Sequence, residues 1–404
     1  MATIRKRGDT YQIRVSVGYD IEGKQITRTK SWKPTPKMSE KQIEKELNRQ
    51  ATLFEEDVKN GLVGDNKQKF SDYARYVLEL KERTGVKHTT IHRYRSLLPL
   101  IDKAIGHLKL AELHPKHLNS FYSQLMQDGM NQKTGGKLST KTIIEYHRFI
   151  SSVLSQAERE LLIPFNPARK ATPPKAEKHE VNYFQVSEVQ RIMECLEHEP
   201  LKYRLLVMLL MTTGCRRGEI LGLKWGKVNR QDRTLRIDNT VLYRPDVGIY
   251  ESNTKTGKAR TVKIPLEVVE LMEQYREWYY KLKLYNGDRW QGSRALSVIG
   301  SPEWISKDFV FVQDNGKPMH PDSITKWLKK FSDDWKLPHI NPHAFRHTAA
   351  SILISQGVDV VTVSKMLGHD KVSTTTDIYS HLLESTSEQA SDTLADVIIR
   401  KRIV

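Results

Sequence analysis

The chain is 404 residues long, enough for two or three domains of ordinary size, and it carries a formal net charge of +17 with a pI near 9.6. So basic a balance favours a polyanionic partner, most simply nucleic acid, although a merely soluble basic protein or a ribosome-associated one would share it. The two cysteines, Cys195 and Cys215, exclude a disulfide framework and a cysteine metal site. The longest apolar run, Leu205 to Met211, is too short for a membrane span, and the N-terminus has no signal-peptide core, so we expect a cytoplasmic protein.

The first 64 residues predict a small sheet that carries one helix. Apolar residues alternate with polar ones from Tyr11 to Val17, a turn follows, and a second strand is expected around residues 24–32. Ser39 and Gln42 can form a capping box for a helix that reaches Gly61. Strands of this kind can enter the DNA major groove, although a charged solvated sheet is the plain alternative. The basic candidates for DNA contact are Arg5, Lys6, Arg7, Arg14, Lys24 and Arg28.

Residues 62–68 read as a short linker, and residues 69–167 as a helical domain. Apolar spacing predicts helices over 73–80, 90–105, 116–126 and 139–162, the second of them broken at Pro99. Phosphate contacts are conceivable for Lys87, His88, Thr89, His92, Arg93 and Arg95, and a solvated helix face explains any one of them equally well. Residues 168–182 are rich in proline and lysine, which predicts an extended basic linker.

The remaining residues, 183–404, contain the groups that suggest chemistry. Core helices are expected over 186–196 and 201–212, and strands over 234–237 and 260–264. Arg216 follows a Thr-Gly turn. His343 and Arg346 stand three apart, so that on a helix they share a face and both could reach one anion. Two further helices are expected before His369, which is followed ten residues later by Tyr379.

These motifs occur together and in a definite order. TGCRRGE, HAFRH, LGH and the tyrosine ten residues later resemble the catalytic signature of the tyrosine recombinases, also called the phage integrase family, over roughly residues 183–381. The resemblance implies a multidomain, mainly α protein with small β-sheets. Residues 1–64 would form an arm-site DNA-binding domain, 69–167 a helical core-site DNA-binding domain, 168–182 a basic linker, and 183–404 an α+β catalytic domain with a C-terminal tail.

The resemblance also implies a role for each site residue. Tyr379 would attack a scissile phosphodiester and form a 3′-phosphotyrosyl link, so the bond energy is retained and no nucleotide cofactor or metal is needed. The other implied roles are phosphate grip for Arg216 and Arg346, general base for His343, hydrogen-bond donor for His369, and proton donor for Lys255, with Lys258 as its competitor. Glu219 would orient Arg216. We expect Arg217 at the surface or on the DNA backbone, and His347 to pack or hydrogen-bond outside the site.

The implied partner is double-stranded DNA at the attachment sites of a mobile element and its target, bound by a homotetramer. An excisionase and a DNA-bending accessory protein are further partners that this class of integrase suggests. The apolar residues after Tyr379 would dock on a neighbouring subunit or, alternatively, close the chain's own domain.

Other readings of the sequence remain open. A chromosome or plasmid dimer resolvase and a non-catalytic DNA-binding regulator share the same fold. Metal-dependent nucleases and transposases need clustered carboxylates, and no such set accompanies these motifs. An RNA-binding module would show aromatic platforms, which the sequence lacks.

Overall fold

The computed structural model describes residues 2–19, 22–36, 38–59, 68–176, 182–254, 257–291, 297–298, 309–379 and 395. The chain divides into two compact units, Met1–His179 and Glu180–Val404. Lys255 and the apolar tail residues Leu382, Leu383, Ala390, Leu394, Val397 and Ile398 lie outside the described residues. Within the described ranges, no helix combines the length and the apolar character that a membrane crossing requires.

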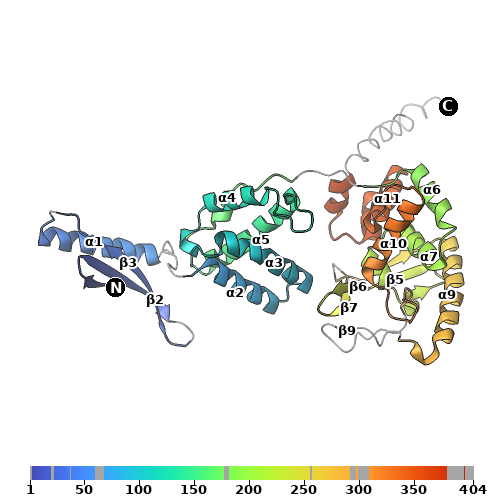
Figure 1. Cartoon of the computed structure of the whole chain (residues 1–404), viewed down its shortest axis with the longest axis horizontal. Coiled ribbons are helices and arrows are strands. Elements are labelled where there is room, and N and C mark those ends of the chain that lie inside the picture. Colours follow the sequence, from blue (N-terminus) through green and yellow to red (C-terminus); the bar gives the residue numbers. More distant parts are fainter. Residues whose placement is uncertain are drawn as a thin grey trace. The chain divides into compact units, whose positions relative to one another are not determined.

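The N-terminal region is a three-stranded antiparallel sheet with one helix on it. β1 (Thr3–Arg7), β2 (Thr10–Tyr19) and β3 (Gln25–Trp32) pair in sequence order, and α1 (Glu40–Lys59) packs against the sheet (Figure 1). Ile13 and Val15 of β2 meet Leu47 and Phe54 of α1 in a small core. The predicted capping box at Ser39 and Gln42 is confirmed, with hydrogen bonds of 2.9 and 3.4 Å. β1 was not predicted.

Residues 68–171 form a helical domain around a core of their own. Its longer helices are α2 (Phe70–Arg83), α3 (His88–Ile101), α4 (Pro115–Leu125) and α5 (Thr140–Arg159). The prediction of a break at Pro99 is wrong, because α3 continues through the proline to Ile101 and then loosens into a π-helix, Asp102–Gly106. Pro99 lacks the backbone N–H that would donate within the helix, yet the helix continues for two residues beyond it.

The start of the expected linker is folded onto this helical domain. Asn166 is buried, and its side-chain amide donates to Ser151 and Ser155 of α5, while its oxygen accepts from the backbone N–H of Ala168 at 2.9 Å. This clasp begins a 3₁₀ turn, Pro167–Lys170, that buries Ala168 completely. The expectation of an extended chain from residue 168 is therefore wrong for residues 168–171.

The second unit packs helices around two small three-stranded sheets. The first sheet has the order β4 (Val228–Asn229), β5 (Thr234–Ile237), β8 (Arg260–Lys263), and the second the order β6 (Asn239–Arg244), β7 (Gly248–Asn253), β9 (Ser297–Val298). The expected strand pair over residues 234–264 is confirmed in antiparallel register, Leu235 opposite Val262. The helices are α6 (Val186–Leu196), α7 (Leu201–Thr213), α8 (Arg217–Leu221), α9 (Leu266–Asn286), α10 (Pro321–Asp334), α11 (Pro342–Ser355) and α12 (Val360–Leu367).

Helices α6 and α7 fall where the apolar pattern predicted core helices, and α11 and α12 fall where two helices were expected before His369. Residues 372–379 are helical as well. The observed architecture thus confirms the predicted fold class, a multidomain and mainly helical chain with small sheets.

Candidate active site

Arg216 stands at the start of α8, where it is fixed by Glu219. Its backbone N–H donates to Glu219 Oε2 at 3.0 Å, and its Nη1 donates to Oε1 at 2.9 Å, so one carboxylate both caps the helix and orients the guanidinium. The Glu219 side chain is 1% exposed. Burial alone would raise the pKa of this carboxyl, but the hydrogen bonds and charges of Arg260 and Arg216 lower it below its usual value, so the group is ionised.

Arg346 lies on α11, close enough to Arg216 for their charges to interact. Its Nη1 donates to the backbone oxygens of Gly214, at 2.7 Å, and Leu367, at 2.8 Å, which ties α11 to the ends of α7 and α12. Its Nη2 is buried without any hydrogen-bond partner among the described residues. Burial, and then the charge of Arg216, lowers the pKa of Arg346 to about 10, which still leaves it charged at neutral pH. A buried cation with an unused donor is suited to receive an anion.

His369 follows Gly368, whose left-handed backbone (φ +70°) ends α12. Its Nδ1 lies 2.8 Å from the hydroxyl of Thr375, a fully buried residue. Burial, followed by the charges of Arg346 and Arg216, lowers the pKa of His369 to about 4, so the ring is neutral at pH 7. If Thr375 donates to Nδ1, the Nε2 atom carries the proton and can donate a hydrogen bond.

Tyr379 is 1% exposed, and its hydroxyl lies 2.8 Å from Nδ1 of His347. The expectation that His347 bonds outside the site is therefore wrong. The same helix that places Arg346 places His347 one residue later, toward the helix over residues 372–379. Burial raises the pKa of Tyr379 to about 12, partly offset by the charge of Arg346, and burial lowers the pKa of His347 to about 4. A neutral imidazole can accept the phenol proton.

The remaining sequence candidates are placed differently. His343 is exposed at the start of α11, close enough to His347 to lower the pKa of that histidine. Arg217 turns to α10, where it contacts Asp322 at 3.3 Å and Thr325 at 2.8 Å. Lys258, the competitor of Lys255, has its Nζ 3.7 Å from a carboxylate oxygen of Asp370, the neighbour of His369. Because Lys255 lies outside the described residues, its assignment stays a prediction.

Arg260 of β8 is a site residue that the sequence analysis missed. Its Nη2 donates to Glu219 at 2.6 Å and contacts the sulfur of Cys215 at 3.2 Å, and its Nε donates to the backbone oxygen of Met366 at 3.2 Å. Arg216 and Arg260 thus both bond the Glu219 carboxylate, and Arg346 lies close enough for its charge to interact with all three groups, so the cluster has a net positive charge. In the sequence, Arg260 only stands at the end of a short basic segment, and nothing there distinguishes it from an arginine exposed to solvent.

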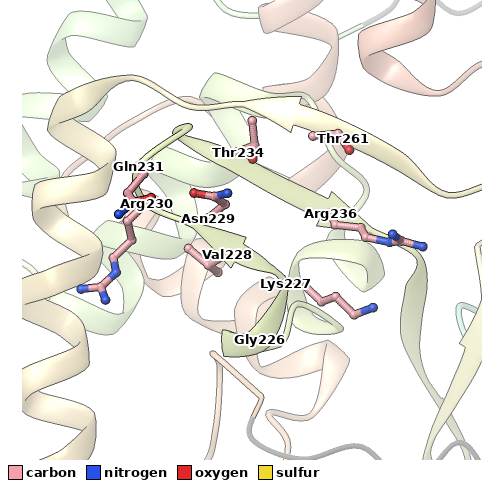
Figure 2. Close-up of a pocket in the computed structure, with 9 residues that line it drawn as sticks. All are labelled: Gly226, Lys227, Val228, Asn229, Arg230, Gln231, Thr234, Arg236 and Thr261. Atoms are coloured by element: carbon pink, nitrogen blue, oxygen red, sulfur yellow. The ribbon is translucent and has the colours of Figure 1, made fainter.

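A cavity of about 500 Å³ on the β4–β5–β8 sheet contains none of these residues. Figure 2 shows Lys227 and Arg236 extending to one side of it and Arg230 to the other. Each cation has a carboxylate partner. Asp238 lies 2.8 Å from Lys227 and 3.3 Å from Arg236, and Glu273 lies 2.9 Å from Arg230. The described residues also contain no group of three His, Cys, Asp or Glu side chains that could hold a metal ion.

The DNA-contact candidates of the N-terminal sheet lie on both of its faces. Residues that pair directly across an antiparallel sheet point to the same face. Arg5 pairs with Gln12, and Thr3 with Arg14, on the face away from α1, and Arg7 shares that face. Lys6 pairs with Tyr11, and Arg28 with the buried Val15, on the face that carries α1. Lys24 precedes β3. Only Arg5, Arg7 and Arg14 are therefore presented together on the open face.

The candidates around α3 do not form one surface either. Arg93 pairs with Glu145 of α5 at 2.9 Å, whereas Arg95 pairs with Glu82 of α2 at 2.6 Å, so these two side chains leave the helix in different directions. Lys87, His88, Thr89 and His92 occupy the N-terminal end of the helix, and all four are exposed apart from their local contacts.

Comparisons with known proteins identify the family of this chain. Residues 182–386 match the model of the phage integrase family, and residues 69–173 match the phage integrase SAM-like domain. A tyrosine recombinase XerC-like protein of Caldanaerobacter subterraneus subsp. tengcongensis is 26% identical, with 98% of each chain covered. The ICEBs1 integrase of Bacillus subtilis is 22% identical over 70% of this chain and 71% of its own.

Two solved structures show the same fold. The Tn1549 transposon integrase in complex with transposon right end DNA superposes with a TM-score of 0.66 at 19% identity, covering 81% of this chain and all of that one. A lambda integrase dimer bound to a core site superposes with a TM-score of 0.55 at 14% identity, covering 76% and 94%.

Proposed function

The chain belongs to the phage integrase family and is a tyrosine recombinase, a DNA breaking-and-rejoining enzyme, and from this premise we propose that it integrates and excises a mobile element by site-specific strand exchange. The observation that carries the proposal is Nη2 of Arg346, which is buried near Arg216 and His369 and has no hydrogen-bond partner in the part of the chain that the structure describes. A scissile phosphate is an anion that such a cluster would bind. The Tn1549 and lambda integrases, both solved in complex with DNA, support the choice of an integrase.

In the proposed mechanism the Tyr379 oxygen attacks the phosphorus, and the bond from phosphorus to the 5′ oxygen breaks. The product is a 3′-phosphotyrosyl link and a 5′-hydroxyl, which later attacks the partner strand's link and releases the tyrosine. Arg216 and Arg346 bind the non-bridging oxygens, and His369 donates to one of them through Nε2. Lys255 supplies the proton to the leaving oxygen.

The base that takes the phenol proton has two candidates. His343 is the one that the family resemblance implies, whereas the 2.8 Å contact to the hydroxyl belongs to His347. Because Tyr379 is almost fully buried, it must leave its present position before attack, and His347 is then its partner at rest rather than at the moment of reaction. We therefore keep His343 as the proposed base and assign His347 to the resting arrangement.

The proposed partner is double-stranded DNA, engaged by a homotetramer, with an excisionase and a DNA-bending protein as accessories. Residues 1–64 would bind arm sites, through the open face that carries Arg5, Arg7 and Arg14, and residues 69–167 would bind core sites. A dimer resolvase remains the second candidate function, because a relative that aligns over 98% of this chain is named a tyrosine recombinase XerC-like protein.

The catalytic proposal is tested with a nicked suicide duplex that carries the element's own end. The full-length protein is incubated with it in EDTA, and a denaturing gel is run for a covalent protein–DNA adduct. We expect an adduct with the unaltered protein and none with Tyr379→Phe, which should still shift the duplex in a native gel. A bound duplex without adduct, or an equal adduct with Tyr379→Phe, would refute the assignment. Adduct on a chromosomal dimer-resolution site but not on element ends would favour the resolvase.

The arm-site proposal is tested by footprinting on the element ends. Arg14→Ala should weaken protection of the arm site about tenfold or more while leaving the core site protected. Lys30→Ala is the matched control, because this cation lies on the α1 face, where its Nζ contacts Gln50 at 3.0 Å. Equal losses in both variants, or none in either, would contradict the assignment of the open face.

A further inference from the structure

Arg260 joins three separate parts of the candidate active site. It is the first residue of β8, and only 14% of its side chain is exposed. Its Nη2 reaches Glu219 at 2.6 Å, at the start of α8, and its Nε reaches the oxygen of Met366 at 3.2 Å, at the end of α12. A planar guanidinium presents several donors in fixed directions, so one side chain can hold both acceptors.

The contact with Glu219 bears on Arg216. Each oxygen of that carboxylate is engaged, Oε1 by the Arg216 guanidinium and Oε2 by both the Arg216 backbone and Arg260. If Arg260 were absent, Oε2 would lose its shortest hydrogen bond, and the carboxylate would be held by Arg216 alone, a residue three positions away on the same short helix. The Glu219–Arg216 pair would then have lost its hydrogen bond to β8, and the direction of the Arg216 guanidinium would be less firmly fixed.

The contact with Met366 bears on His369. The guanidinium of Arg260 lies close against Gly368, where an added Cβ would come within 2.9 Å of Nη1 and 3.0 Å of the central carbon. Gly368 also needs a positive φ to end α12, so this position combines a backbone demand with a close approach. The backbone at Gly368 therefore packs directly against the Arg260 guanidinium, which fixes the position of this turn and of His369 after it.

We propose that Arg260 is a positioning residue for strand cleavage, which sets Arg216 through the Glu219 carboxylate and His369 through the Gly368 turn, without itself touching the DNA. This inference rests on the proposed function of the same site. A lysine at this position keeps the charge but has a single nitrogen, which cannot bond Glu219 and the Met366 oxygen in the same geometry. The defect of Arg260→Lys is therefore expected to lie between that of Arg260→Met and the unaltered protein.

The test is single-turnover cleavage of the suicide duplex by the full-length protein, over a range of protein concentrations. Arg260→Met should lower the rate at saturation about 100-fold, the size expected when a reacting group is misplaced by about an ångström. The half-saturating concentration should stay within about twofold, because binding contacts are kept. Arg230→Met is the matched control. This change removes an exposed arginine–glutamate pair of 2.9 Å, between the turn that follows β4 and helix α9, and the variant should cleave at the normal rate.

A double-mutant cycle with Glu219→Gln tests whether Arg260 acts through this carboxylate, with each variant assayed at a temperature at which circular dichroism shows it to be folded. If Arg260 acts through this carboxylate, the two defects combine to less than their product. Three results would overturn the inference: unchanged cleavage by Arg260→Met, full rescue by Arg260→Lys, or defects that multiply. If Arg260→Met does not fold, the two comparisons are made with Arg260→Lys, whose normal rate would be equally decisive. Failure of the proposed function is distinct, since the unaltered protein would then form no adduct.

Discussion

Replacing Glu219 by glutamine should strongly lower the free energy of unfolding of the catalytic unit, Glu180–Val404. The change keeps the shape of the side chain but removes the one negative charge that faces Arg216, at 2.9 Å, and Arg260, at 2.6 Å, in a position where the side chain is 1% exposed. Breaking a buried ion pair by neutralising one partner costs about 3–5 kcal/mol, because the remaining charge is left without compensation. Such a loss is a large part of a typical domain's total stability of about 5–15 kcal/mol.

Urea unfolding followed by tryptophan fluorescence measures this loss, since every tryptophan except Trp32 lies in the unit Glu180–Val404. The matched control is Glu251→Gln. Glu251 is equally buried, but it faces a single cation, Lys224, at 2.9 Å, and one of its oxygens has no hydrogen-bond partner among the described residues. We expect a smaller loss of stability for Glu251→Gln, and a normal rate of adduct formation.

The pH dependence gives the prediction a sign. The folded state lowers the pKa of Glu219 below its usual value of 4.5, so its contribution to stability is complete above about pH 4.5 and is lost as the pH falls through the folded pKa. The unaltered protein should therefore lose more stability on acidification below pH 4.5 than Glu219→Gln does. Two results would refute this account of the arginine cluster: a free energy of unfolding of Glu219→Gln at pH 7 within about 1 kcal/mol of that of the unaltered protein, or an equal loss of stability by both proteins below pH 4.5.

Three further substitutions test other parts of the structure. Arg346→Lys keeps a cation, but a lysine has no second nitrogen to bind phosphate while the first bonds the backbone oxygens of Gly214 and Leu367. Adduct formation at saturating protein should therefore fall about 100- to 1000-fold. A fall of less than tenfold would contradict the proposed binding of phosphate by Arg346. Gly214→Ala should lower the melting temperature, because its Cβ would lie 2.6 Å from Leu367 Cδ2 at a φ of +60°; an unchanged melting curve would show that α12 can shift at no cost. Asn166→Ala should expose the backbone near Ala168 to faster hydrogen exchange and cost about 1–3 kcal/mol, whereas exchange at the native rate would mean that the clasp is dispensable.

Local patterns in the sequence predicted much of the fold. The alternation at Tyr11–Val17 and the apolar repeats of residues 186–212 identify strands and helices, since each reflects one buried face. The prediction failed where a distant contact overrides the local pattern. Residues 168–171 have the composition of a linker, but the amide of Asn166 bonds α5 and holds them on the helical domain. Pro99 is typical of a helix end, but α3 continues through it to Ile101.

The site could be predicted from its motifs only as a set of residue types. Spacing placed Arg216 beside Glu219 and put His369 after a helix end, both within one local element. Residue spacing could not predict the contacts between different helices and strands. Arg260 is 41 positions from Glu219 and 106 from Met366 along the chain, and the contact of His347 with Tyr379 spans 32 positions. Nothing in a single sequence reports such pairs.

The Tyr379 ring is buried, so its hydroxyl is shielded from DNA in this structure. Its ring belongs to a small cluster with Ala350, Ile354, Val363 and Leu367, which is separate from the main core of the catalytic unit. Moving the ring outward would break its 2.8 Å contact with His347 and open this small cluster, whose buried residues are not part of the main core. If Tyr379 is the nucleophile, as proposed, its hydroxyl cannot attack DNA until the ring has moved out of this cluster. We therefore expect a chance encounter with duplex DNA outside a recombination site to leave both strands intact.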